Sequence, residues 1–242
     1  MRRTHLIGAL VGVFALVLSA VAVASPQFKQ TVKVKYTTAK AQKAAGLSVN
    51  LSATDPGAVP AGAQPGVKTL KITFKGAKVN FKAAKVCKLS KDQAESCPAN
   101  TKIGTGKASA NLVGTNTQTG AKTVVPNLAQ TVAAYTAKGG IYLVVKGTTL
   151  PTTAILKANL SKKGALSVNV ERDLPVIPGG NKIVLTDFAV KIKKVTSGKG
   201  KKAKAFITTP KCGKSKKFTV KSNFVYDDGS KKNLTNTQKC KA

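Results

Sequence analysis

Hydrophobic and polar residues alternate along most of the chain with a period of two. Over residues 70–75, leucine, isoleucine and phenylalanine alternate with lysine and threonine, and the segments 32–36 and 190–193 repeat the pattern with lysine at each polar position. This is typical of a β-strand with one face on a core and the other in water. We therefore predict strands whose outer faces carry lysine.

Turn-forming residues separate these alternating runs at short intervals. Glycine-containing turns at 138–140, 162–164 and 227–229 each lie between two such runs, as the turn of a hairpin does. After the first 24 residues, no stretch carries a convincing helical stripe. The pattern predicts an all-β fold, namely an antiparallel β-sandwich of immunoglobulin-like or related type.

Composition suggests how this fold is divided. We predict a single β-sandwich domain over residues 25–242, of sufficient length to bury a core. Residues 54–66 hold three prolines and three glycines and are expected to form a long loop or a linker. Residues 196–204 are rich in lysine and glycine and are expected to form a flexible, positively charged segment between two strands. Residues 205–242 are expected to form a terminal hairpin closed by a disulfide.

The first 24 residues have the pattern of a secretory signal peptide helix. Arg2 and Arg3 precede an uncharged apolar run over 6–18, and 22–24 supplies the small residues that a signal peptidase requires. An uncleaved anchor is the alternative, because 6–24 is long enough to span a bilayer. We predict cleavage after Ala24, which gives a secreted or cell-wall-associated protein with no later membrane span.

All four cysteines lie in the part predicted to be exported, where an even count indicates disulfides. Three pairings are possible. We favour Cys87 with Cys97 and Cys212 with Cys240, because each pair closes a local loop that contains a turn. A four-cysteine zinc site would need closely spaced C-x-x-C pairs, which are absent from the sequence. We expect no metal and no cofactor.

The segment around the first two cysteines carries a family resemblance. Cys87 is followed by Cys97-Pro98 and then by the run ANTKIGTG, which together resemble a C…CP-x-x-[ST]-x-[IV]-G-x-[GA] signature of uncharacterised secreted actinobacterial β-rich proteins. The C-terminal part is similar to theirs as well, with Cys212, an alternating run, an acidic-glycine turn and Cys240. It lacks the aromatic residue expected shortly after Cys212. The resemblance implies export, disulfides and a β fold, and it implies no activity.

The glycines of this segment also have a physical interpretation. Gly104 and Gly106 permit a bulge or a close approach of two backbones where a strand begins. A phosphate-binding P-loop requires G-x-x-x-x-G-K-[ST], and neither that spacing nor the final hydroxyl is present.

The sequence lacks most catalytic signatures. The only histidine is His5, inside the predicted signal peptide, so a mature chain has no histidine for a triad, a metal site or a general base. There is no G-x-S-x-G or S-x-x-K motif. Carboxylates remain, and Glu171 and Asp173 would share a face if they lay on a strand. We interpret them as a strand end with a local ion pair to Arg172, and expect no enzyme. A carboxylate-dependent hydrolase of unfamiliar type is the alternative.

The net charge of the chain indicates the class of partner that it attracts. Without the signal peptide, 39 basic residues stand against 8 acidic ones, a net charge of +31, and all but Arg172 of the basic residues are lysine. Such a charge attracts polyanions. Lysine lacks the bidentate fork of arginine, and few aromatic residues are free to stack on bases, so we expect no sequence-specific binding of nucleic acid.

Two clusters of lysine, over residues 199–204 and 211–217, are poorly explained by the covering of outer strand faces. We expect them to hold anionic cell-wall or surface polymers, including polysaccharides, by electrostatic attraction of low specificity. A purely structural surface protein, whose lysines only maintain solubility and protect strand edges, is the alternative. The candidate residues of the two clusters are Lys199, Lys201, Lys202, Lys204, Lys211 and Lys214.

Overall fold

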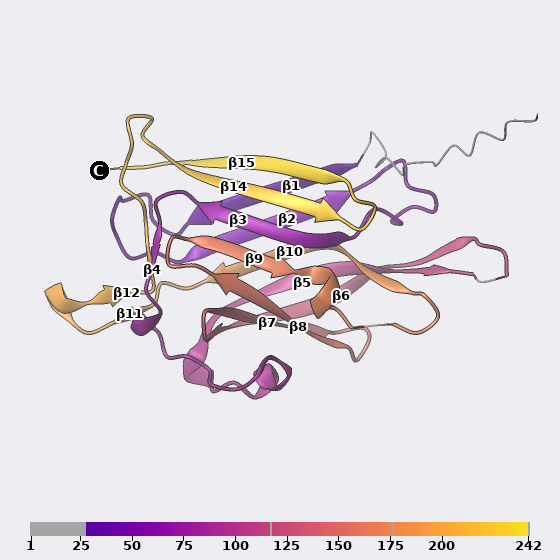
Figure 1. The fold of residues 1–242 in the computed structure, drawn as a ribbon, viewed down its shortest axis with the longest axis horizontal. Coiled ribbons are helices and arrows are strands. Elements are labelled where there is room, and N and C mark those ends of the chain that lie inside the picture. Colours follow the sequence, from indigo (N-terminus) through magenta and orange to yellow (C-terminus); the bar gives the residue numbers. More distant parts are fainter. Residues whose placement is uncertain (1–27, 117, 176, 242) are drawn as a thin grey trace, which may run out of the picture.

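The fold of the described residues is built almost entirely from antiparallel strands (Figure 1). The computed structural model describes residues 28–116, 118–175 and 177–241, with Lys201 described through its backbone only. The predicted signal peptide lies outside these residues. The all-β prediction is confirmed.

Eleven strands form one continuous sheet. In the order in which they lie side by side, they are β1 (Lys29–Tyr36), β2 (Leu47–Thr54), β10 (Lys182–Ile192), β5 (Lys102–Thr115), β6 (Lys122–Ala137), β7 (Gly140–Gly147), β8 (Thr153–Leu160), β9 (Ala165–Asn169), β3 (Val67–Phe74), β14 (Lys217–Tyr226) and β15 (Lys231–Lys239).

Short elements connect and extend this sheet. Two small strand pairs join β4 (Lys78–Val79) to β13 (Ile207–Thr208) and β11 (Thr196–Ser197) to β12 (Lys204–Ala205). The helical turns are η1 (Phe81–Ala83), η2 (Lys91–Ser96), η3 (Ala99–Thr101), α1 (Val170–Asp173) and η4 (Gly200–Lys202). The segment predicted to be flexible, residues 196–204, is therefore largely a short hairpin of β11, η4 and β12.

The sheet folds over on itself into two layers, which face each other as in a sandwich (Figure 1). We call the half of the sheet that holds β1, β2, β10, β5 and β6 one layer, and the half from β7 through β8, β9, β3 and β14 to β15 the other. The alternation read from the sequence places the apolar side chains between the layers, as along β1, where every second residue is buried. Tyr36 of β1 packs there against Phe74 and Phe218 of the opposite layer, with ring centroids 6.1 and 5.3 Å away.

The two edges of the sheet meet where β1 lies beside β15. Side-chain amides join them in place of a backbone ladder. The backbone N–H groups of Val34 and Tyr36 donate to Asn236 Oδ1 and Gln238 Oε1 at 2.9 and 2.8 Å, and Gln238 Nε2 donates to the Tyr36 carbonyl at 3.1 Å. Open edges invite pairing with another chain, and these contacts satisfy part of the exposed backbone of β1.

Removing both amides should weaken the fold and expose β1. We expect Asn236→Ala combined with Gln238→Ala to lower the free energy of unfolding by about 2–4 kcal/mol, because three hydrogen bonds are lost. Urea unfolding measures the loss, and light scattering reports self-association through the freed edge. Thr235→Ala with Thr237→Ala, on the exposed face of the same strand, is the matched control. Equal behaviour of the two double variants would show that the amides do not hold the edges together.

The predicted turns are confirmed. Residues 138–140, 162–164 and 227–229 connect β6 to β7, β8 to β9 and β14 to β15, and Gly139, Gly164 and Gly229 have φ of +73°, +75° and +82°. Residues 54–66 connect β2 to β3. The segment is held to the sheet by a hydrogen bond in which Gln64 Nε2 donates to the Ala53 carbonyl at 2.9 Å.

Gly104 and Gly106 allow the backbone of β10 to approach β5 closely. A Cβ atom on Gly106 would lie 2.1 Å from the Ala189 carbonyl oxygen, and one on Gly104 would lie 2.5 Å from that of Lys191. The register of β5 against β6 also shifts between Lys102 and Gly104. The glycines of the IGTG run therefore serve the close packing of two strands and a register shift where β5 begins, as the sequence predicts.

Both favoured disulfides are present, and no cysteine of the described residues is free. The Cys87–Cys97 bond closes a loop that contains η2, and it packs against Tyr142 and Val144 of β7 in a small cluster apart from the main core. The Cys212–Cys240 bond ties the loop before β14 to the residue after β15.

Candidate functional site

Four segments that are distant in sequence meet at one end of the molecule. They are residues 37–46, 75–80, 193–217 and 239–241, which together we call the basic end. It carries sixteen lysines and no aspartate or glutamate. Figure 1 shows this end on the left, where β4, β11, β12 and the C-terminus lie.

Backbone and hydroxyl hydrogen bonds hold these segments together. Thr209 Oγ1 accepts from the Lys43 N–H at 2.9 Å and donates to the Lys40 carbonyl at 2.8 Å. The Ala41 N–H donates to the Lys241 carbonyl at 2.8 Å. Antiparallel pairing of β4 with β13 then brings 78–79 beside 207–208. The lysines of the basic end therefore stand on connected backbone.

The basic end contains a hollow of about 480 Å³, which we call the basic hollow. Four lysines line it: Lys75 follows β3, Lys78 begins β4, Lys211 lies in the loop after β13, and Lys217 begins β14. All four are exposed. Gln42, Thr208, Thr209 and Ser215 add polar side chains to the lining.

Within the part of the chain that the structure describes, no carboxylate pairs with the lysines of the basic hollow. The ion pairs that the described residues form all lie elsewhere, and they join Lys68 to Glu171, Lys91 and Arg172 to Asp173, Lys146 to Glu95, and Lys182 to Asp227. A concave surface lined by charge of one sign focuses its field and concentrates counter-ions. The basic hollow is therefore suited to phosphate, sulfate or carboxylate groups, with hydroxyl and amide groups available as hydrogen-bond donors.

The six lysines predicted from sequence fall into two groups. Lys199, Lys202 and Lys204 are exposed on the projecting hairpin of β11, η4 and β12, which we call the finger. Lys201 lies on the same hairpin, and its side chain is outside the described residues. Lys211 lines the basic hollow, and Lys214 is exposed in the same loop.

Sequence reasoning missed three lysines that line the basic hollow, namely Lys75, Lys78 and Lys217. Lys75 and Lys78 flank a turn in which Gly76 has φ +78°, and Lys217 begins an alternating strand. Each reads from sequence as an ordinary solvated lysine. Only the pairing of β4 with β13 shows that they share a surface with Lys211.

Glu171 and Asp173 do not lie on a strand and so do not share a strand face, because β9 ends at Asn169. They lie on α1, a single helical turn whose N-cap is Asn169, with Asn169 Oδ1 accepting from the Arg172 N–H at 2.9 Å. Glu171 is exposed and pairs with Lys68 Nζ at 3.1 Å, whereas the Asp173 side chain is fully buried. The two carboxylates therefore have different partners and different environments.

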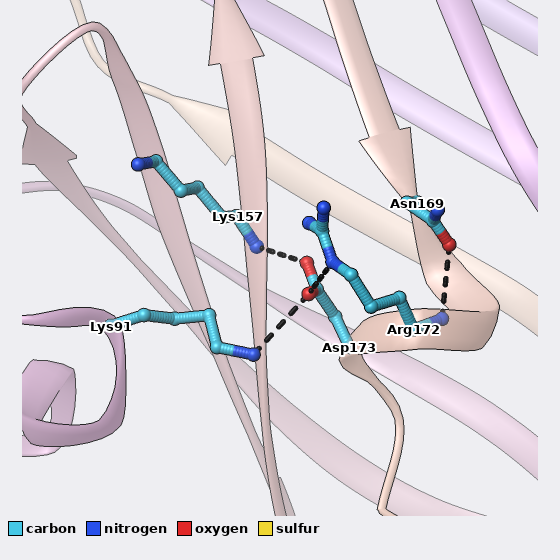
Figure 2. A network of polar contacts seen from close by, with 5 residues as sticks. All are labelled: Lys91, Lys157, Asn169, Arg172 and Asp173. Carbon is cyan, nitrogen blue, oxygen red and sulfur yellow. Dashed lines mark hydrogen bonds and ion pairs between the residues drawn. The ribbon is translucent and has the colours of Figure 1, made fainter.

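Asp173 is the centre of a polar network that joins three elements, as Figure 2 shows. Its carboxylate accepts from Arg172 Nε at 3.0 Å, from Lys91 Nζ of η2 at 3.2 Å, and from the backbone N–H of Lys157 in β8 at 2.8 Å. Burial alone would raise the pKa of Asp173, but hydrogen bonds from Arg172, Lys157 and Lys91 outweigh it and hold that pKa below its ordinary value. The expected local ion pair with Arg172 is confirmed.

This network should make the protein sensitive to acid. The pKa of Asp173 is lower in the folded than in the unfolded chain, so its stabilising contribution is complete above the unfolded pKa of about 3.9. That contribution is lost as the pH falls through the lower folded value. Denaturant unfolding from pH 7 to pH 2 should therefore show the stability gap between the parent and Asp173→Asn closing below about pH 4. A gap that stays constant over this range would contradict the network.

The aromatic side chains are not placed for stacking on an exposed ligand. Those of the described residues are buried, apart from the half-buried Phe81 and Tyr135. Base recognition on single strands uses exposed aromatic faces. The surface of the described residues offers charge without such platforms.

Metal-ligand clusters, membrane-spanning helices and similar proteins were also sought, and none was found for the described residues or for the sequence. Among the described residues, no three potential metal ligands of the His, Cys, Asp or Glu type cluster together, and no helix is long and apolar enough to cross a membrane. Comparison with known protein families, curated proteins and solved structures finds no match to this chain.

Proposed function

We propose that this protein is an exported, non-catalytic β-protein that holds to anionic polymers of the cell envelope through its basic end. The observation that carries the proposal is the basic hollow. Lys75, Lys78, Lys211 and Lys217 line it, and none of the carboxylates in the described residues pairs with them. Two disulfides support export, because such bonds persist in oxidising compartments.

The shape of the basic end favours a polymer over a small anion. The basic hollow supplies one concave site, and the finger extends the positive surface away from it with Lys199, Lys202 and Lys204. A chain with repeated negative charges contacts both places at once and releases many counter-ions. Lysine ammonium groups are hydrated point charges, so the attraction discriminates little among phosphate, sulfate and carboxylate polymers.

Retention on immobilised dextran sulfate, with neutral dextran as the matched matrix, tests the proposal. We expect the protein to bind dextran sulfate at low ionic strength, to elute as salt rises, and to pass through neutral dextran. Equal behaviour on both matrices would refute the proposal. It would favour a structural role in which lysine only maintains solubility.

A further inference from the structure

A second feature of the fold is a row of three adjoining cavities between the core and the surface, which together we call the passage. The inner one, of about 90 Å³, lies between the two layers and is lined by apolar residues of both, among them Ile72, Leu143 and Leu160. It adjoins a smaller cavity of about 30 Å³, which we call the neck, because Leu156, Leu185 and other residues line both.

Next to the neck lies an outer cavity of about 270 Å³, which we call the mouth. Gln130, Thr152 and Ile183 line both the neck and the mouth, so these two cavities also adjoin. Ile183 lies at the start of β10, and Ile192 at the other end of that strand precedes the basic end. The passage therefore opens at the end of the molecule opposite the basic hollow.

The rim of the mouth is unusually apolar for this surface. Only three large hydrophobic side chains of the described residues are exposed, and two of them are Val125 and Leu150. Leu150 lines the mouth at 40% exposure, and Val125 is the cross-strand partner of Leu112, another lining residue. Cross-strand partners share a face of the sheet, so Val125 extends the same apolar rim.

The chemistry of the passage is graded along its length. The inner cavity has no polar side chain, so it offers none of the two to four hydrogen-bond partners that a buried water needs. Polar side chains occur farther out, at Gln130 and Thr152. The neck, of about 30 Å³, is the smallest of the three cavities.

We infer that the passage binds a single unbranched acyl chain. The tail lies in the inner cavity, and the polar head lies at the mouth beside Gln130 and Thr152. This site is separate from the basic end and does not depend on the function proposed for it. A void between well-packed layers costs stability when it is empty, and an apolar chain restores the missing contacts.

Nuclear magnetic resonance tests the inference with dodecanoic acid and dodecan-1-ol, each labelled with ¹³C at the terminal methyl. We expect both to bind the purified protein, with nuclear Overhauser contacts from that methyl to Ile72, Leu143 or Leu160. High salt should preserve the contacts, because burial of the tail is not screened. Binding of neither probe would overturn the inference. So would binding of dodecanoate alone that disappears at high salt without these contacts, since that pattern belongs to surface lysines.

Variants at the neck and the mouth add a second test. Ala108→Leu narrows the neck and should reduce the affinity for both probes by about tenfold or more, whereas Ala133→Leu, on the same layer but away from the passage, should change it by less than about twofold. Leu150→Lys should weaken the binding of the uncharged dodecan-1-ol without altering the core. Unchanged affinity in both Ala108→Leu and Leu150→Lys would overturn the inference. If Ala108→Leu does not fold, the nuclear Overhauser contacts of the probe methyl in the parent protein still test the inference.

Discussion

Glutamine at Lys75, Lys78, Lys211 and Lys217 should weaken binding to dextran sulfate by a factor on the order of 10 to 100 at low ionic strength. These side chains line the basic hollow without acidic partners. Each contact with an anionic group contributes about one to the slope of log affinity against log salt, so the slope should fall by roughly three to four. A salt titration of binding measures both quantities.

The matched control removes the same charge from outer strand faces. Lys33, Lys71, Lys107 and Lys122 are exposed on β1, β3, β5 and β6, and none belongs to the ion pairs of the described residues. Glutamine at these four positions should leave most of the affinity intact, and both quadruple variants should keep the parent's stability to within about 0.5 kcal/mol per position. Equal losses of affinity in the two variants would show that net charge alone attracts the polymer, with no contribution specific to the basic hollow.

Alanine at Asp173 should cause the largest loss of stability among single substitutions of the acidic residues. The change leaves the Lys157 N–H without its acceptor and removes the carboxylate that pairs with Lys91 and Arg172. Breaking a fully buried pair costs about 3–5 kcal/mol. Lys91 and Arg172 remain partly in water, with side-chain exposures of 33% and 59%, so we expect about 2–4 kcal/mol by urea unfolding.

Two neighbouring variants identify the cause of that loss. Glu171→Ala removes an exposed ion pair on the same helical turn and should cost less than about 1 kcal/mol. Asp173→Asn retains one acceptor for the Lys157 N–H and should fall between the two. A loss at Asp173 no greater than that at Glu171 would show that the network does not link η2, α1 and β8.

The sequence predicts local features of this fold well, because they depend on neighbouring residues. Alternation with a period of two places Val32, Val34 and Tyr36 inward, as observed in β1. Glycine marks the turns, since each of the three predicted turns needs a residue with positive φ. The cysteine spacing correctly favours two local disulfides.

Features that depend on distant residues were not predicted. The sequence does not indicate that the two layers belong to one sheet. Nor does it indicate that the side-chain amides of Asn236 and Gln238 join the two edges of that sheet. Nor does it show that Lys75 and Lys78 face Lys211, which requires the pairing of β4 with β13. Candidate lysines chosen by clustering in sequence therefore included Lys211 and omitted its neighbours in space.

The helical turn at Glu171 and Asp173 had a local signal that sequence reasoning did not use. Asn169 precedes the run Val170-Glu171-Arg172-Asp173, and asparagine is a favoured N-cap. A cap at this point predicts a helical turn, which separates the two carboxylates, whereas continued alternation predicts that they lie side by side. Here the alternation of β9 ends and the cap determines the local structure.

Fractionation of the native host tests the central claim most directly, by comparing the parent with the variant that carries glutamine at Lys75, Lys78, Lys211 and Lys217. The account predicts that the parent is found with the cell envelope and is released by a salt wash, and that the variant is recovered mainly in the medium. Retention of both proteins inside the cell, or equal and salt-resistant attachment of both to the envelope, would contradict it.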